Sequence, residues 1–212
     1  QAIAVIADVL DQQQVIEARD VVLESWGRVD VLVNAAGGNL GRARNDERSI
    51  FDVPFDAFDD VLRLNLHGSV IPALVFAQPM ALAGKGCVIN ISSMAATQAI
   101  SGVMGYSAAK AAIDNFTRWL AVDLAHRHGD GIRVNAVAPG FFVTDQNRNV
   151  LIGADGEWTP RARAIIQRTP MRRFGEPHEL VGAVHWLCSD AASFVTGAVI
   201  PVDGGFSAFS GV

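Results

Sequence analysis

The chain has 212 residues, of which 50% are hydrophobic and 18% charged, and its formal net charge is −5. This length suits one domain with a substantial core, and the high apolar content is ordinary for a parallel sheet covered on both faces. An acidic balance without a basic block argues against a nucleic-acid partner, and no uninterrupted apolar run reaches the ~20 residues that cross a bilayer.

Apolar runs of strand length alternate along the chain with segments of helical period. The strand-like runs cover 2–9, 29–38, 86–93, 131–140 and 196–205, and the helical segments cover 12–26, 57–83, 105–127 and 176–188. Pro72 and Pro79 predict kinks or breaks within 57–83. Segment 141–175 is expected to be irregular, apart from a short amphipathic piece between Pro160 and Pro170. The alternation predicts a single α/β domain over 1–212, with a Rossmann-like, doubly wound parallel sheet and helices on both faces.

The two cysteines, Cys87 and Cys188, lie far apart in the sequence and lack CxxC or Cys/His ligand spacing. This pattern predicts two small buried hydrophobic side chains, with neither a metal site nor a disulfide scaffold. The first residues lack the basic-then-apolar layout of a signal peptide, so we expect a cytoplasmic protein with no membrane partner.

Polar and small residues stand where the predicted strands end. They are Asp8, the stretch 34–37 (NAAG), Ser92 with Ser93, and the pair Pro139-Gly140. In a doubly wound sheet, ligands bind beyond the carboxyl ends of the strands. Each of these residue types also occurs in ordinary turns, but four such ends at one edge of the sheet predict a ligand site there.

The stretch GYSAAKAAID (105–114) holds the single tyrosine of the chain, Tyr106, and one of its two lysines, Lys110. Residues four apart on a helix share a face, so the phenol and the ammonium can lie together. A free phenol titrates near ~10, and a neighbouring ammonium favours the phenolate. We therefore expect Lys110 to lower the pKa of Tyr106 and make it a proton donor and acceptor near neutral pH. The alternative is a core tyrosine beside a surface lysine.

Five features follow one another in a fixed order: Asn34-Ala-Ala-Gly37, Asn65, Ser93, Tyr106-x-x-x-Lys110 and Pro139-Gly140. This order resembles the short-chain dehydrogenase/reductase family over essentially the whole chain. The resemblance implies an enzyme in which Tyr106 is the acid/base, Ser93 hydrogen-bonds the substrate oxygen and Lys110 holds the nicotinamide ribose hydroxyls. Ser92 is expected to be structural. Asn65 would place a water that relays protons to Lys110; alternatively, it is a buried polar residue that fixes a helix bend.

The same resemblance implies NAD or NADP as the cofactor. Asp8 and Val9 would contact the adenine edge, Asn34, Ala35, Ala36 and Gly37 the adenosine side, and Pro139, Gly140, Phe142 and Thr144 the nicotinamide. Family members often carry a second asparagine where this chain has Ala35. A small-molecule substrate and no metal are expected.

The glycine-rich TGxxxGxG turn that opens members of this family does not occur in the sequence. The GKG at 84–86 is not a phosphate loop, because no Ser or Thr follows the lysine in register. The run 2–9 resembles the third strand of the family, so we expect roughly fifty residues with the first two strands to precede Gln1 in the whole protein. They would include the residues that choose between NAD and NADP. The alternative from another class is a cofactor-free binding or regulatory relative.

Four longer stretches resemble the D-mannonate oxidoreductase (fructuronate reductase) group of this family: NAAGGN (34–39), PGFFVTDQNR (139–148), TPMRRFGEP (169–177) and SFVTGAVIPVDGGFSAFSGV (193–212). The resemblance implies interconversion of a keto and a hydroxy sugar acid, whose carboxylate a bidentate arginine could recognise. Arg148 is the predicted carboxylate ligand, beside Asn147 and with Asn39 as a polar helper; the alternative is an ordinary surface arginine. A reductase of another sugar, a polyol or a 3-ketoacyl thioester is the alternative activity.

Segment 141–175 carries Gly153, Gly156 and flanking prolines, which suits a lid over the substrate. A surface loop without a gating role is the alternative. The family resemblance further implies a homo-oligomer, a tetramer or dimer, that associates through 57–83 and 105–127.

Overall fold

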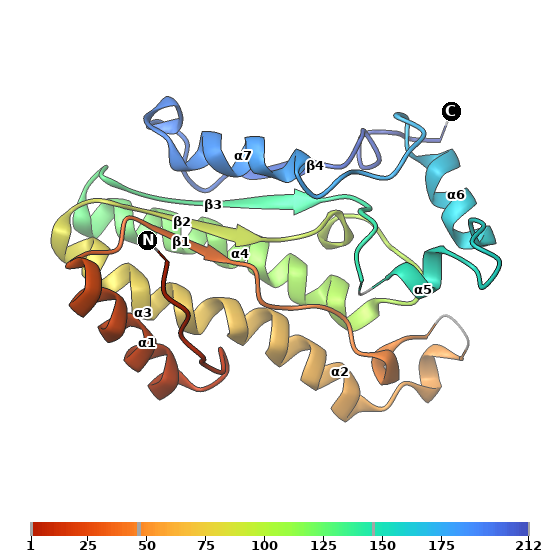
Figure 1. Ribbon diagram of the computed structural model, residues 1–212, viewed down its shortest axis with the longest axis horizontal. Coiled ribbons are helices and arrows are strands. Elements are labelled where there is room, and N and C mark those ends of the chain that lie inside the picture. The colour runs from red at the N-terminus through yellow and green to blue at the C-terminus, as the bar shows by residue number, and fades with distance from the viewer. Residues whose placement is uncertain (1, 46–47, 146, 212) are drawn as a thin grey trace.

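The computed structural model describes residues 2–45, 48–145 and 147–211. Its centre is a parallel sheet of four strands in the order β1-β2-β3-β4, which cover Val31–Asn34, Gly86–Ile91, Ile132–Pro139 and Val199–Val202 (Figure 1). The register places Asn34 beside Asn90 and Pro139 beside Val202, so the carboxyl ends of the strands meet at one edge. The predicted parallel α/β sheet is confirmed, although β1 and β4 are shorter than the apolar runs that contain them.

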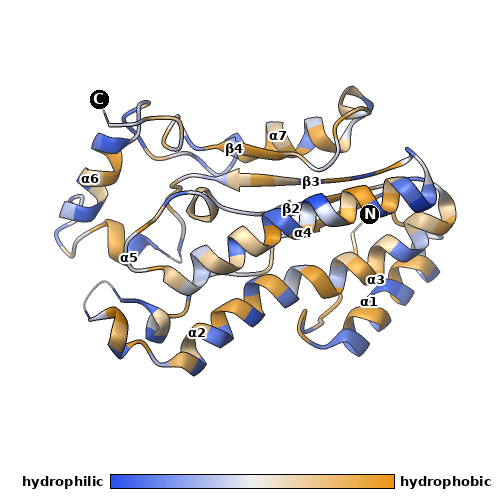
Figure 2. Cartoon of the chain, turned by 180° about the vertical axis from the view of Figure 1, so that it is seen from behind, coloured by the Kyte–Doolittle hydropathy of each residue, from blue (hydrophilic) through white to orange (hydrophobic). Residues whose placement is uncertain are grey.

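Helices cover both faces of this sheet. α3 (Gly68–Ala83) packs against β1 and β2, and α4 (Met104–His128) packs against β3. α7 (Glu179–Cys188) covers β2, β3 and β4 from the other side. Figure 1 shows α7 above the strands, with α1 (Gln12–Trp26), α2 (Phe55–Leu62) and α3 below them. Figure 2, from behind, shows α4 in front of the strands and above α3.

The core has two layers because successive residues of a strand point to opposite faces. On the side of α3 and α4, Val88 packs with Met80. On the side of α7, Cys87 and Ile89 pack with Leu187. All five are nearly inaccessible to solvent, which explains why β2 is apolar on both faces.

The two cysteines meet in the layer under α7. Cys188 packs against the cluster that contains Cys87, and both are free thiols. Burial raises the pKa of Cys87 to about 12, and the neighbouring Cys188 adds to this rise. A thiol with so high a pKa is unreactive. The prediction of a small buried side chain is therefore confirmed for Cys87, whereas Cys188 is only half-buried.

The predicted first strand, 2–9, is wrong. Residues 2–8 have no strand structure, and no described strand pairs with them, so their backbone groups have no ladder to join. Ile6 is 100% exposed. The helix that follows, α1, begins and ends as predicted. The Asp11 side chain caps it by accepting from the Gln13 N–H at 2.9 Å, and Gly27 with φ 72° ends it.

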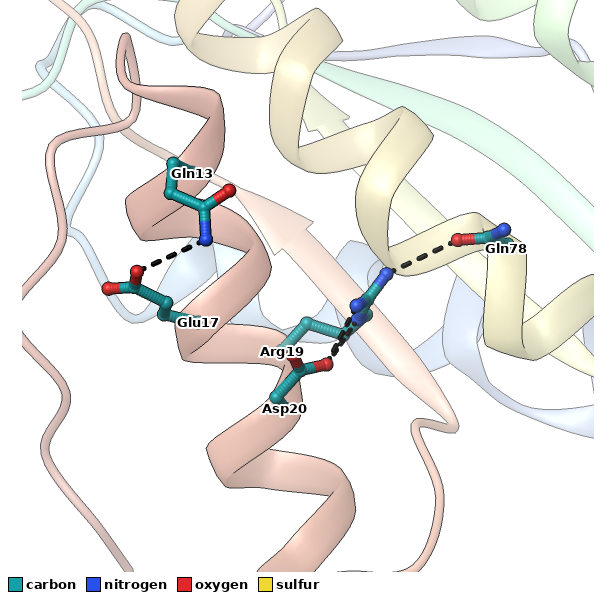
Figure 3. A network of polar contacts seen from close by, with 5 residues as sticks. All are labelled: Gln13, Glu17, Arg19, Asp20 and Gln78. Carbon is teal, nitrogen blue, oxygen red and sulfur yellow. Dashed lines mark hydrogen bonds and ion pairs between the residues drawn. The ribbon is translucent and has the colours of Figure 1, made fainter.

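Polar contacts connect α1 to α3 (Figure 3). Arg19 of α1 donates to Gln78 of α3 at 3.2 Å and pairs with Asp20 at 2.7 Å, while Gln13 donates to Glu17 at 3.2 Å. The Asp20 side chain is 59% exposed, so water screens the ion pair and it adds little stability. These contacts set the direction of the Arg19 side chain toward α3 rather than the strength of the packing.

The predicted helix 57–83 is present, but it is interrupted elsewhere than expected. Pro72 and Pro79 both lie inside α3 without ending it. Pro72 is buried against the core, and we attribute its tolerance to packing that outweighs the ~3 kcal/mol cost of an interior proline. The interruption is a π-helical turn over Arg63–His67, between α2 and α3. Such turns often occur at functional sites, and this one contains Asn65.

Among the described residues, the continuous helix Phe55–Ala83 is long and apolar enough, by length and composition, to cross a membrane. The count of uninterrupted apolar runs missed this helix. One face of its α3 part belongs to the core, where Ala73, Ala77 and Met80 pack with the residues of the sheet. A core helix of a sheet protein has the same composition.

Segment 141–175 is less irregular than expected, because it contains α5 (Arg148–Leu151) and α6 (Pro160–Arg168). α6 is the predicted amphipathic piece. Pro160 opens it, and the Thr159 hydroxyl caps it by accepting from the Ala162 N–H at 3.2 Å. The segment has its own hydrophobic cluster, made of Leu151, Ala162, Ile165 and Phe174. It therefore packs as a unit beside the sheet edge.

Candidate active site

The carboxyl edge of the sheet brings Ser93, Tyr106 and Lys110 together. β2 ends at Ile91, and two residues later Ser93 caps a 3-10 turn by accepting from the Ala95 N–H at 3.1 Å. Tyr106 lies in the first turn of α4 and is hydrogen-bonded to Ser93. Lys110 follows one turn later on the same face and is buried. The Tyr106–Lys110 pair predicted from helical spacing and the serine that the family resemblance adds to it thus form one cluster.

Lys110 carries a buried ammonium with donors to spare. Its Nζ donates to the Ile91 carbonyl at 2.7 Å and lies 5.4 Å from the centre of the Tyr106 ring. An ammonium has three N–H donors, so two remain for other acceptors. Burial lowers the pKa of Lys110 to about 8, and the nearby Asp114 carboxylate opposes this change. Lys110 is therefore mostly charged at neutral pH and loses its charge as the pH rises through about 8.

The expected lowering of the Tyr106 pKa by Lys110 is wrong for this structure. Burial raises the pKa of the phenol, and the hydrogen bond with Ser93 opposes the rise only in part. Burial of the ring disfavours the charged phenolate more than the hydrogen bond with Ser93 stabilises it. Tyr106 is therefore protonated at neutral pH, which is the state that donates a proton.

Asn65, in the π-helical turn, hydrogen-bonds the loop that follows β1. Its Nδ2 donates to the carbonyls of Gly38 at 2.7 Å and Val61 at 2.8 Å, and its Oδ1 accepts from the Gly38 N–H at 3.1 Å. Gly37 has φ 148°, and a Cβ there would lie 2.6 Å from Asn65 Oδ1 and 3.7 Å from Lys110 Nζ. These contacts support the role of fixing a helix bend, whereas the water relay stays a prediction.

Replacing Asn65 with alanine is expected to lower the free energy of unfolding by about 2–3 kcal/mol, because one buried and two partly buried backbone groups lose a partner and a buried group without one costs ~1–3 kcal/mol. Urea unfolding followed by circular dichroism measures the change. Asn149→Ala removes an exposed amide from α5 and is the matched control, expected within about 0.5 kcal/mol of the unchanged protein. A loss below about 1 kcal/mol in Asn65→Ala would contradict this role.

The Asn34 side chain faces the protein interior rather than the sheet edge. Its Nδ2 donates to the Ser69 carbonyl at 3.2 Å and to Asn90 Oδ1 at 2.9 Å, and Asn90 in turn donates to Thr117 Oγ1 at 2.9 Å. This buried ladder ties β1 and β2 to α3 and α4. Sequence reasoning missed Asn90 and Thr117, although the asparagines occupy paired positions on neighbouring strands. Residues 35–37 are exposed beyond β1, and their cofactor contacts stay a prediction.

Asp8 and Val9 form the turn before α1. The Asp8 carboxylate accepts from the Leu10 N–H at 2.9 Å, and Val9 lies so close to Gly68 that a Cβ there would be 3.0 Å from Val9 Cγ2. Val9 thereby packs against the start of α3. The contact of both residues with an adenine ring stays a prediction.

Pro139 ends β3, and Gly140 follows where only a glycine fits. A Cβ at Gly140 would lie 2.6 Å from the backbone of Asp203, beyond β4. Gly140 also lines the cleft beside Tyr106, and the nicotinamide-holding role of this pair stays a prediction.

The side-chain amide of Asn147 holds the loop after β3. Its Oδ1 accepts from the Thr144 N–H at 2.9 Å, and its Nδ2 donates to the Phe142 carbonyl at 2.8 Å. Phe142 is buried and Thr144 is exposed. Arg148, the next residue, is exposed and does not line the cleft beside Tyr106. The structure therefore gives Asn147 a loop-holding role and does not bring Arg148 to the predicted carboxylate site.

A cleft of about 390 Å³ opens beside Ser93 and Tyr106. Its other polar lining residues are Asn39, Arg44, Asn147, Asn149 and Arg161, and its larger apolar ones are Met94, Ile100, Val103, Phe141, Val150 and Leu151. No Asp or Glu is among the described residues that line it, although the whole chain has a net charge of −5. Sequence reasoning missed Arg44 and Arg161, because only the fold shows which of fifteen arginines reach the cleft.

A buried carboxylate behind Lys110 was also missed. Asp114 is 4% exposed, lies one helical turn after Lys110, and accepts a short hydrogen bond from Ser92 Oγ. Burial raises the pKa of Asp114, while Ser92, Arg118 and Lys110 oppose that rise. The contact with Asp114 explains Ser92 as a structural residue. The spacing Tyr-x-x-x-Lys-x-x-x-Asp on one helix face is the sequence signal that could have identified Asp114.

Comparison with known proteins decides the family. A family model described as enoyl-(acyl carrier protein) reductase matches residues 1–207. The chain belongs to the short-chain dehydrogenase/reductase family. An uncharacterized oxidoreductase of Bacillus subtilis (strain 168) is 45% identical over 100% of this chain and 78% of its own length.

Two solved structures are similar to this member of the family. A Haemophilus influenza protein with bound NAD, named as a candidate D-mannonate oxidoreductase, has 42% identity and a TM-score of 0.89 over 97% of this chain and 77% of its own. A gluconate 5-dehydrogenase from Burkholderia cenocepacia J2315, in complex with NADP and tartrate, has 33% identity and a TM-score of 0.85 over 97% of this chain and 75% of its own. The chain is accordingly an oxidoreductase that uses NAD or NADP.

The residues at the sheet edge fit the ribose end of such a cofactor. Lys110 has two N–H donors left for hydroxyl oxygens. Because Gly37 has no side chain, its backbone can lie close to Asn65 and Lys110. The sequence has no glycine-rich phosphate turn, so the fit concerns this end alone. Within the described ranges, no group of three His, Cys, Asp or Glu side chains is placed to hold a metal ion.

Proposed function

We propose that this oxidoreductase interconverts a keto and a hydroxy sugar acid of the D-fructuronate/D-mannonate kind. The observation that carries the proposal is the charge of the cleft beside Ser93 and Tyr106. It is lined by Arg44 and Arg161 and by no described acidic residue. Guanidinium groups bind carboxylates in pairs of charge-assisted hydrogen bonds. Asn39 and Asn149 add amides that suit a polyhydroxylated chain.

In this proposal the chain's own residues bind the substrate and move one proton. Ser93 donates a hydrogen bond to the reacting oxygen, and Tyr106 gives its proton to that oxygen on reduction and takes it back on oxidation. Lys110 binds the nicotinamide ribose hydroxyls and steadies the charge that develops on Tyr106. Bound NAD or NADP supplies or accepts the hydride. Asn65 acts indirectly, by holding Gly37 and Gly38 next to Lys110.

Two similar proteins support the choice of substrate. One is named as a candidate D-mannonate oxidoreductase, and the other is a gluconate dehydrogenase that was solved with tartrate, itself a hydroxy acid. A neutral sugar, a polyol or a 3-ketoacyl thioester is the alternative substrate, and a cofactor-free binding relative is the alternative class. A cleft with two arginines favours an acid over the neutral compounds.

We further propose how the enzyme is organised. Residues 1–212 belong to one Rossmann-type domain in which 141–175 is the substrate lid, because α5 and α6 form a separately packed unit over the cleft. Leu74, Leu82, Trp119 and Val122 are exposed on α3 and α4, which supports a homo-oligomer, a dimer or tetramer, through these helices. We place the enzyme in the cytoplasm.

Oxidation of NADH and NADPH, followed by absorbance at 340 nm, tests the substrate. The compounds are D-fructuronate, D-tagaturonate, 5-ketogluconate, D-fructose and an acetoacetyl thioester. We expect at least about 10²-fold higher kcat/KM for one keto acid than for the neutral sugar, since charge-assisted pairs contribute ~1.5–3 kcal/mol. Activity with the thioester alone would overturn the sugar-acid proposal. The absence of both cofactor binding and turnover of any of these compounds would favour the cofactor-free binding relative.

A further inference from the structure

We infer that Arg161, on the lid helix α6, is the residue that binds the substrate carboxylate, and that Asn39 donates to a second substrate oxygen. This inference rests on the proposed function and names the specificity-determining residue within it. Arg161 is half-buried and lines the cleft that also contains Ser93 and Tyr106. It comes from the lid side of the cleft, whereas the two reactive hydroxyls come from the sheet and α4.

Among the described residues, the Arg161 guanidinium has no carboxylate partner and is held in position by Ser101. Its Nη1 donates to Ser101 Oγ at 3.1 Å and its Nη2 donates to the Ser101 carbonyl at 3.1 Å. Both acceptors are neutral, so the positive charge is not compensated by them. A guanidinium has five N–H donors, and these two contacts leave three for a ligand. A preorganised cation with spare donors is what recognition of a carboxylate requires.

The other arginines near the cleft are less suitable. Arg148 is exposed and outside the lining. Arg44 lines the cleft but already makes an interaction of its own. Arg168 is the last residue of α6. It donates to the Phe209 carbonyl at 3.3 Å and lies over the Phe209 ring. Within the described part of the chain, Arg161 therefore combines a place in the cleft with donors whose partners are neutral.

Asn39 provides an independent observation on the same cleft. Its Nδ2 is buried and has no hydrogen-bond partner among the residues that the structure describes, while its Oδ1 accepts from the Leu40 N–H at 3.1 Å. A buried donor without an acceptor costs ~1–3 kcal/mol. A substrate oxygen in the cleft would remove this cost. An amide donor and a guanidinium in one cleft match a compound that carries both hydroxyls and a carboxylate, such as an aldonate or a keto-uronate.

The position of Arg161 also links acid binding to the lid. Through Ser101 it already connects α6 to the loop that follows the Ser93 turn. A carboxylate held by Arg161 would therefore add a contact between the lid and the substrate. Lids of this kind exclude water from the reacting atoms.

The test compares Arg161→Gln with Arg161→Lys and with Arg163→Gln, a control that removes an exposed arginine from the same helix. For each variant, kcat/KM is measured with a keto acid and with D-fructose as its neutral counterpart. Arg161→Gln is expected to lower kcat/KM for the keto acid by about 10²-fold and to change that for fructose by less than about 3-fold. Arg161→Lys should restore part of the loss, and Arg163→Gln should match the unchanged enzyme. Calorimetric titration of the NAD-loaded enzyme with D-mannonate should show the same order of affinities.

Equal losses for the acid and the neutral sugar in Arg161→Gln would show a structural effect and overturn the inference. A selective loss in Arg148→Gln or Arg44→Gln, with Arg161→Gln unchanged, would assign the carboxylate elsewhere and also overturn it. Both outcomes leave the proposed function intact. An unchanged enzyme that turns over no keto acid would overturn the proposed function, and the inference with it. Asn39→Leu, which replaces the unpartnered amide by an apolar group, should lower the affinity for D-mannonate by about 10-fold; an unchanged affinity would remove Asn39 from the site.

Discussion

Tyr106→Phe is expected to lower the turnover number by about 10³-fold at neutral pH, while the affinity for NADH or NADPH stays within about 2-fold of its original value. The substitution removes only the phenolic hydroxyl. The ring keeps its packing against the cluster of Ala43, Ala57 and Val61, so the fold and the neighbouring Lys110 remain in place. A loss of this size is what general acid/base catalysis by one side chain contributes.

Stopped-flow or steady-state absorbance gives the turnover number, and the fluorescence of NADH gives its affinity. Ser107→Ala is the matched control, since it removes the hydroxyl of the next residue, which is buried and has no partner within the described ranges. We expect less than about 2-fold change in turnover for this control. If Tyr106→Phe retained more than a tenth of the turnover, the proton would have to come from another donor.

The sequence was sufficient for the sheet and for the Ser93–Tyr106–Lys110 cluster, because both depend on local rules. A strand buried on both faces is a continuous apolar run, and residues four apart on a helix share a face. The carboxyl ends of parallel strands meet at one edge, so Ser93 could be placed at that edge without coordinates, and the family resemblance then paired it with Tyr106. The prediction of a strand over 2–9 was wrong because a strand needs a neighbouring strand to pair with. Composition does not reveal whether such a neighbour lies beside 2–9.

Contacts that depend on the path of the chain could not be predicted in the same way. Arg148 follows Asn147 directly, yet it points to solvent, whereas Arg161 reaches the cleft from a helix thirteen residues later. The prediction that Lys110 lowers the pKa of Tyr106 was wrong for a related reason. Spacing places an ammonium near the phenol, but burial decides the sign of the shift, and burial is a property of the whole fold.

Asp114→Asn is expected to move the basic limb of the pH profile for substrate reduction to lower pH by about one unit. In the unchanged enzyme, Lys110 loses its proton as the pH rises through about 8. Since the Asp114 carboxylate raises the pKa of Lys110, removing that charge lowers the pKa further. Lys110 then becomes neutral at a lower pH, and the cation that supports proton donation by Tyr106 is lost earlier. At pH 8, the variant should reduce its substrate several-fold more slowly, and the difference should shrink toward pH 6.

The other groups around Asp114 do not produce this shift themselves. Ser92 and Arg118 also face the Asp114 carboxylate and help to keep it ionised, but the pKa of Lys110 depends on burial and on Asp114. Asp123→Asn is the matched control, because it removes an exposed carboxylate that pairs with Arg127 on the same helix. That variant should keep the original profile. If Asp114→Asn lowered the rate equally at every pH, Asp114 would act only by holding Ser92 and the end of β2. A displaced basic limb would instead mean that it sets the charge of Lys110.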